Sequence, residues 1–148
     1  MTIRVQREDF DIAAEIDALK RASNATGGVV IFTGVVRDDD GLSSLTLEHY
    51  PGMTEREIGT HVAEAKARWP LTGVTVLHRI GRLRVGDNIV FVAVASGHRQ
   101  AAFAAAEFLI DYLKTRAPFW KQEQRGDSSK WVNSREQDHE AAIRWLKD

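Results

Sequence analysis

A nearly continuous apolar run, Val29 to Val36, limits the folds that this 148-residue chain can adopt. Its side chains alternate between the two faces of an extended strand, and both sets are largely apolar and β-branched. Such a strand needs packing on both faces, so we expect it at the centre of a covered sheet. A chain of this length builds one sizeable core, and we predict a single domain over residues 1–148.

Helix and strand patterns follow one another irregularly along the rest of the chain. Amphipathic helices are predicted over Asp11 to Ala22, Thr54 to Trp69 and His98 to Arg116, with a last one starting at Asn133 or Ser134. Further strands are predicted at Ser43 to Tyr50, Val74 to Ile80, Asn88 to Ser96, Trp120 to Gln124 and Lys130 to Val132. Strict βαβ alternation is missing, which favours an α+β fold with mixed or antiparallel pairing.

Two local details accompany this assignment. Thr54 followed by Glu57 predicts a capping box at the start of the second helix. The strand after the acidic loop, Ser43 to Tyr50, is close enough in sequence to Val29–Val36 for the two to pair as a hairpin.

Composition excludes several classes of function. The chain has no cysteine, which rules out disulfides, cysteine-zinc sites, iron-sulfur ligation and a thiol nucleophile. Its 20 basic residues nearly balance 21 acidic ones, so a nucleic-acid partner is not expected. Apolar runs are far shorter than the ~20 residues of a membrane span. The charged N-terminus lacks an export signal, and we expect a cytoplasmic protein that does not enter membranes.

Three cations meet where Pro118 ends the third predicted helix. Lys114, Arg116 and Lys121 either complement the negative end of the helix dipole or line a functional site. In the second interpretation the clustered charges disfavour one another, which would let a partly buried lysine exchange protons near neutral pH. We expect Lys114 to be that residue.

A second candidate anion site lies at the start of the same helix. His98 and Arg99 follow a strand and a glycine, where free backbone N–H groups and the helix dipole favour an anion, although such junctions are common. The other histidines show no paired metal-ligand spacing, so we assign them to packing or solvent and predict no metal and no cofactor: His49, His61, His78 and His139.

Several long motifs occur in a fixed order: FTGVVR at 32–37, LTLEHYPGMTE at 45–55, ARWPL at 67–71, HRIG at 78–81, GHR at 97–99 and DYLKTRAPFWKQE at 111–123. Together they resemble the large, catalytic subunit of molybdopterin synthase. The resemblance covers about Val29 to Trp145.

The resemblance implies an α/β-hammerhead fold and a homodimer of large subunits. It also implies a small, ubiquitin-like sulfur-carrier subunit at each end, giving a heterotetramer. The carrier's C-terminal Gly-Gly thiocarboxylate would donate sulfur, in two rounds, to cyclic pyranopterin monophosphate (precursor Z), forming the dithiolene of molybdopterin for the molybdenum cofactor. The missing cysteine agrees with this, because the sulfur arrives on another protein.

Residue by residue, the resemblance implies that Lys114 is the essential lysine and Lys121 the second active-site lysine, both catalytic and substrate-binding. Other matched positions are implied to contact substrate: Arg37, His98, Arg99, Gln122 and Glu123. Arg135 matches an arginine that reaches the site of the neighbouring subunit.

Some positions depart from the family pattern. Val35 and Gln122 stand where polar or basic residues are common, and the loop Asp38 to Ser44 is short and acidic.

The alternative function is a non-catalytic module that binds a phosphate ligand with the same pocket.

Overall fold

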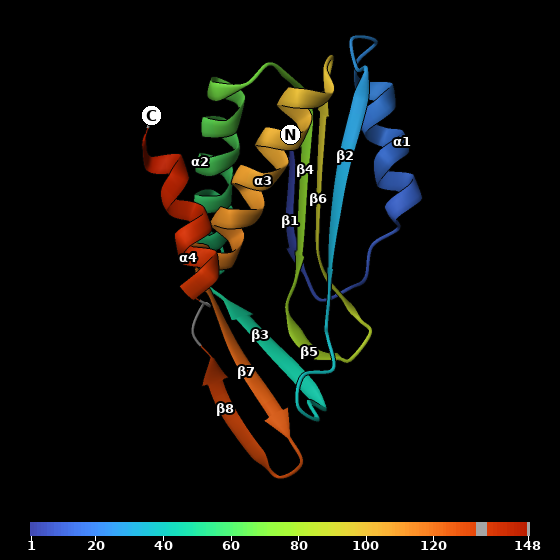
Figure 1. Cartoon of the computed structure of the whole chain (residues 1–148). Helices are drawn as coiled ribbons and strands as arrows, with labels where there is room; N and C mark the ends of the chain where they lie inside the picture. Colours follow the sequence, from blue (N-terminus) through green and yellow to red (C-terminus); the bar gives the residue numbers. More distant parts are fainter. Residues whose placement is uncertain (133–135, 148) are drawn as a thin grey trace.

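Most of the core lies on a four-stranded sheet, here called sheet A (Figure 1). The computed structural model describes residues 1–132 and 136–147. β1 runs parallel to β4, whereas β6 is antiparallel to both of its neighbours, β4 and β2, so the sheet is mixed. In spatial order its strands are β1 (Thr2–Gln6), β4 (Leu71–Arg79), β6 (Asn88–Ser96) and β2 (Gly28–Val35).

Helices cover both faces of sheet A (Figure 1). On one face, Leu19 of α1 packs in a cluster with Leu77, Phe91 and Ala93 of the sheet. The larger apolar cluster lies on the other face, between the valines of β4 and β6 and two further helices. The helices are α1 (Ile12–Ala22), α2 (Met53–Arg68), α3 (Arg99–Thr115) and α4 (Glu136–Ile143), which packs on α3 and leads into a 3-10 turn at Arg144–Lys147.

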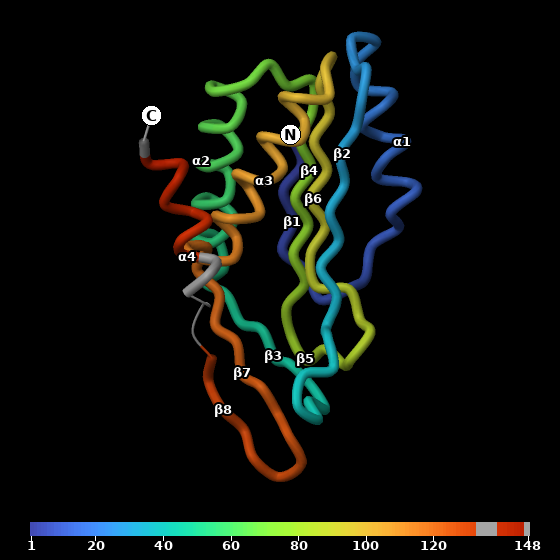
Figure 2. The backbone as a smooth tube through the Cα atoms, viewed as in Figure 1, coloured from blue at the N-terminus to red at the C-terminus, as the bar shows by residue number. Residues whose placement is uncertain are grey.

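A second sheet, sheet B, extends beyond the end of sheet A, as the backbone trace in Figure 2 shows. All its pairs are antiparallel. Leu45 and Leu47 of β3 and Leu83 of β5 are buried with Val36 and Leu42 in a small core of their own. The spatial order is β5 (Gly81–Arg84), β3 (Ser44–His49), β7 (Phe119–Arg125) and β8 (Ser128–Val132).

The α+β prediction with mixed and antiparallel pairing is confirmed, but the place of β2 was predicted wrongly. β2 is an edge strand, and among the described residues it pairs only with β6. Its apolar character on both faces has a different cause: Val29 packs on the α1 side, while Val30 and Phe32 pack on the α3 side. Ile31 is 39% exposed. Covering of both faces therefore does not require a central position.

The predicted hairpin between β2 and β3 is also wrong, because the two strands belong to different sheets. Val36 donates its backbone N–H to Asp87 rather than turning back, and the chain then crosses to sheet B. Leu45 and Leu47 gain their burial there, against β5 and β7.

The predicted capping box lies two residues too far along the chain. α2 starts at Met53, and the backbone N–H of Gly52 donates to Glu55 Oε2 at 3.3 Å, so Glu55 and not Glu57 caps the helix. Thr54 is fully buried and joins other segments instead. Two short strands, β1 and β5, escaped prediction because their charged residues hide the alternation.

Candidate functional site

The strand β7 presents Lys121 toward the body of the molecule. Phe119, Lys121 and Glu123 alternate onto one face of sheet B, because successive strand residues point to opposite faces. In register with them on β3 are His49, Leu47 and Leu45, and both leucines are buried. Lys121 therefore lies on the inner face of sheet B and is partly buried.

A buried histidine lies beneath the junction of α3 and β7. His78 is 5% exposed, and its ring stacks on Phe119 with centroids 3.9 Å apart and an interplanar angle of 19°. It lies on the face of β4 opposite Leu77, which packs toward α1, so His78 faces the α2 and α3 layer. His78 Nδ1 is 2.9 Å from the carbonyl oxygen of Arg79 and donates to it in the neutral ring.

The electrostatics of His78 show how Lys114 and Lys121 are placed. Burial lowers the pKa of His78 to about 3, against the pull of its hydrogen bond to Arg79. The positive charges of Lys121 and Lys114, with a contribution from His49, lower this pKa further. Two lysines from different elements, one on α3 and one on β7, thus act on the same neutral ring.

Thr54, in the motif at 45–55, holds the connector between α3 and β7, and His49 of the same motif joins β3 to α2. The hydroxyl of Thr54 donates to the carbonyl oxygen of Pro118 at 3.1 Å and accepts the N–H of Tyr50 at 3.0 Å. His49 Nε2 lies 3.6 Å from Glu55 Oε1. These contacts join the end of β3, the start of α2 and the segment that precedes Lys121.

Arg37 and Glu123 are linked through a third residue. Arg125 donates to Glu123 Oε1 at 2.9 Å and to the carbonyl oxygens of Asp39 and Asp40. Arg37 lies in the same loop, 65% exposed at its side chain and 3.7 Å from Asp39 Oδ2. The predicted substrate contacts Arg37 and Glu123 are therefore brought to the same end of sheet B.

Gln122 lies on the other face of the sheet from Lys121 and Glu123, because side chains alternate along β7. It lines a polar pocket of about 370 Å³ with Ser44, Thr46, Arg82 and Gln124 among other residues. Its side chain does not share a surface with the two lysines, although the resemblance implied that it contacts the substrate together with them.

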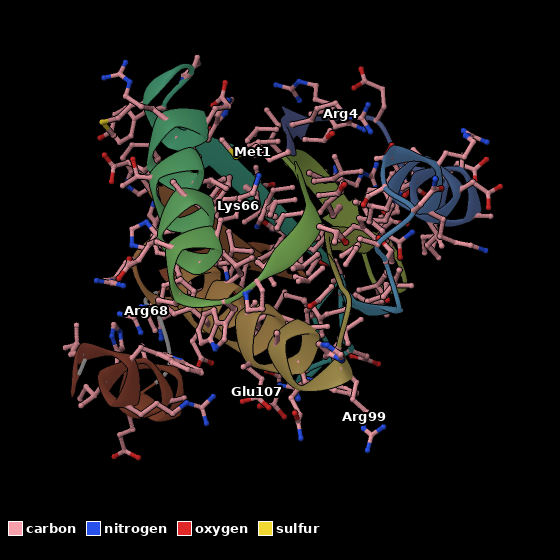
Figure 3. The ribbon with its side chains drawn as sticks, turned by 90° about the horizontal axis from the view of Figure 1, so that it is seen from above. Met1, Arg4, Lys66, Arg68, Arg99 and Glu107 are labelled. Atoms are coloured by element: carbon pink, nitrogen blue, oxygen red, sulfur yellow. The ribbon has the colours of Figure 1, made fainter. Side chains whose placement is uncertain are left out.

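His98 and Arg99 stand at the opposite end of α3 from Lys114. The helix has 17 residues, and at 1.5 Å per residue its ends are about 25 Å apart. Both residues are exposed, and His98 occupies the N-cap position without a side-chain capping bond. Arg99 projects outward from that end of the helix (Figure 3). Within one chain they do not meet the lysines.

Of the remaining predicted residues, Arg135 lies outside the part of the chain that the structure describes. Arg116 is exposed, with its guanidinium 5.8 Å from the centre of the Tyr112 ring.

Over residues 1–132 and 136–147 no three potential His, Asp or Glu ligands come together, and the absence of a metal stays a prediction. No helix in the described part of the chain is long and apolar enough to cross a membrane.

The assignment of His78 to packing is confirmed, but its position beside Lys114, Lys121 and His49 was not predicted from the sequence. A signal for both histidines was present: His49 continues the inward-facing alternation of Leu45 and Leu47, and His78 ends a run of five buried residues on β4. A histidine at a core position of a strand is a candidate for a role in a site, even where no second possible metal ligand lies nearby in the sequence.

The family model described as "MoaE protein" matches residues 5–116. This chain belongs to the MoaE family. The molybdopterin synthase catalytic subunit of Mesorhizobium japonicum is 60% identical over 147 residues, covering 97% of this chain and 92% of the relative.

Solved structures of the family share the fold. A molybdopterin biosynthesis MoaE protein from Burkholderia ambifaria superposes with a TM-score of 0.85 at 46% identity, covering 98% of both chains. Molybdopterin synthase from Staphylococcus aureus gives a TM-score of 0.80 at 32% identity, covering 87% of this chain and 95% of the other. The expectation of a MoaE-type fold is confirmed.

Proposed function

We propose that this chain is the catalytic subunit of molybdopterin synthase. It transfers sulfur from the C-terminal thiocarboxylate of a small carrier subunit to cyclic pyranopterin monophosphate, and two transfers build the dithiolene of molybdopterin. The cyclic phosphate opens as the two carbon–sulfur bonds form, and each carrier is left with an ordinary carboxylate whose new oxygen comes from water or from the substrate oxygen that sulfur replaces. The observation that carries this proposal is the convergence of Lys114 and Lys121 around the neutral, buried His78, in a chain 60% identical to a named catalytic subunit.

The two lysines suit this chemistry. Both substrates are anionic, so ammonium groups at the inner face of sheet B attract the thiocarboxylate and the phosphate together. Lys114 is the residue that orients the thiocarboxylate and exchanges protons at the reacting carbons, and Lys121 assists it. Because His78 stays neutral, it adds no competing positive charge beneath them.

Arg37, in the loop after β2, and Glu123, two residues from Lys121 on the same face of β7, also bind the substrate. The guanidinium of Arg37 is exposed and able to form paired hydrogen bonds to a phosphate. Glu123 is already engaged by Arg125, so its second oxygen is the one available to a polar substrate group. Gln122 would take part only through its backbone.

His98 and Arg99 act in the site of a second copy of the chain. The length of α3 separates them from Lys114 by about 25 Å, which one small substrate does not span. A homodimer resolves this if the N-terminal end of α3 of one copy approaches sheet B of the other, and Arg135 would cross in the same way. The full assembly then contains two such chains and two carrier subunits. Each chain is a single domain, and the assembly works in the cytoplasm.

The competing function is a binding module that holds a phosphate ligand without turnover. Purified chain is mixed with cyclic pyranopterin monophosphate and with carrier that ends either in a thiocarboxylate or in an ordinary carboxylate. We expect molybdopterin only with the thiocarboxylate form. No product from a folded, carrier-bound chain that still binds the substrate would favour the binding module.

A further inference from the structure

Arg125 holds two separate segments together at the edge of the site. Its Nη2 donates to the carbonyl oxygen of Asp39 at 2.8 Å, and its Nε lies 3.2 Å from the carbonyl oxygens of both Asp39 and Asp40. Its Nη1 donates to Glu123 Oε1 at 2.9 Å. One guanidinium thus binds a loop and a strand that are 86 residues apart in sequence.

The loop that Arg125 grips carries Arg37. Its two ends are fixed independently: the N–H of Val36 donates to the carbonyl of Asp87, and the N–H and hydroxyl of Ser43 both reach the carbonyl of Gln124, at 2.9 and 2.8 Å. Between these points Asp40 has a positive φ of 51°, which a non-glycine residue adopts at a cost. The N–H of Leu42 donates to the Asp39 carbonyl at 3.2 Å within the loop, and the guanidinium of Arg125 reaches the carbonyls of Asp39 and Asp40 from β7.

We propose that Arg125 is a positioning residue that sets Arg37 and Glu123 for substrate binding. The side chain does not touch substrate. It fixes the loop 37–42 by its carbonyl oxygens and orients Glu123 through the carboxylate, so both substrate-facing groups keep one spacing. The activity part of this inference rests on the proposed function, whereas the clamp itself does not.

Arginine is suited to this role and lysine is not. The three N–H directions used here belong to one rigid, planar group, whereas a lysine ammonium presents one point charge on a flexible stem. The hydrogen bond to Glu123 also raises the pKa of Arg125, whose guanidinium is already charged near neutral pH. Arg125→Lys therefore keeps the charge and loses the geometry.

The clamp is tested first by hydrogen exchange of the backbone amides of residues 37–42 in the intact chain without substrate. Arg125→Ala and Arg125→Lys should both speed exchange in this loop, whereas Arg84→Ala, an exposed arginine of the same sheet, should not. If Arg125→Ala fails to fold, Arg125→Lys alone decides. Unchanged exchange in a folded variant would overturn the clamp, even if the wild type formed no molybdopterin.

The positioning role is tested by a double-mutant cycle with Arg37. Arg125→Ala should raise KM for cyclic pyranopterin monophosphate by roughly 3- to 30-fold with a smaller change in kcat, as expected for residues coupled in one network. Arg37→Ala should then cost less in the Arg125→Ala background than in the wild type. Losses that simply multiply would show that Arg125 does not act through Arg37.

Discussion

His78 is the side chain on which most of the site's electrostatics converge. It is buried, stacked on Phe119, hydrogen-bonded to the carbonyl of Arg79 and surrounded by the charges of Lys114, Lys121 and His49. A histidine in this position must stay neutral in the folded chain. That requirement links the stability of the fold to pH.

We predict that His78 makes the protein sensitive to acid. Its folded pKa of about 3 lies below the ordinary value of 6.5, so below pH 6.5 the unfolded chain takes up a proton that the folded chain refuses. The free energy of unfolding therefore falls as pH drops from about 6.5 toward 3, by up to about 1.4 kcal/mol per pH unit from this group. Urea unfolding at several pH values measures the slope.

His78→Gln should remove this part of the slope, since glutamine does not titrate and can still donate to the Arg79 carbonyl. His139→Gln, at an exposed histidine of α4, is the matched control and should keep it. Equal slopes for His78→Gln and the wild type would mean that His78 is not held neutral.

The elements of the site meet through Thr54. It lies on α2, accepts the N–H of Tyr50 that follows β3, and donates to the carbonyl of Pro118 that precedes β7. We predict that Thr54→Val, which keeps the shape and removes the hydroxyl, lowers the free energy of unfolding by about 1 kcal/mol, because two partly buried backbone groups lose their partner. It should also reduce activity by displacing Lys121.

Thr54→Ser is the comparison for this change. Serine keeps both hydrogen bonds and loses one buried methyl group, for about 0.8 kcal/mol. Denaturant titration of the three proteins should therefore rank wild type, serine and valine in that order. A valine variant at least as stable as the serine variant would contradict the bridging role of the hydroxyl.

Elements with strong internal periodicity were predicted well from the sequence, and contacts between distant segments were not. The bounds of β6 were predicted correctly, and those of α1 and α3 to within one residue at each end, because apolar spacing and terminal glycine or proline residues mark them locally. The edge position of β2, the crossing between sheets and the roles of Thr54, His78 and Arg125 depend on partners that lie tens of residues away. The motifs of the family predict Lys114 and Lys121 as site residues, and in the fold the charges of both act on His78.

At the scale of the whole molecule, the number of chains that contribute residues to one site is decided by the length of α3. Figure 1 shows α3 running along sheet A, with its C-terminal end at the start of β7 and its N-terminal end at the far side of the molecule. The lysines and the His98–Arg99 pair therefore lie near opposite ends of α3 in one molecule. A second copy is the simplest source of the missing contacts.

We predict that two inactive variants complement each other. Lys114→Ala and His98→Ala chains, carrying different tags and purified as mixed dimers, would have one intact site out of two if each site draws on both copies. Roughly half of the wild-type activity should then return, as expected for two symmetry-related sites. No recovery from verified mixed dimers would show that His98 does not serve the partner's site.

The most direct test of this account is the amount of molybdopterin formed by Lys114→Ala with thiocarboxylated carrier and cyclic pyranopterin monophosphate. A residue that transfers protons during the reaction should lower the rate by at least about 100-fold when removed. Lys66→Ala, at an exposed lysine of α2, should match the wild type. Wild-type product from a folded Lys114→Ala variant would contradict the proposed site; its loss in this variant alone would establish Lys114 as the residue on which sulfur transfer depends.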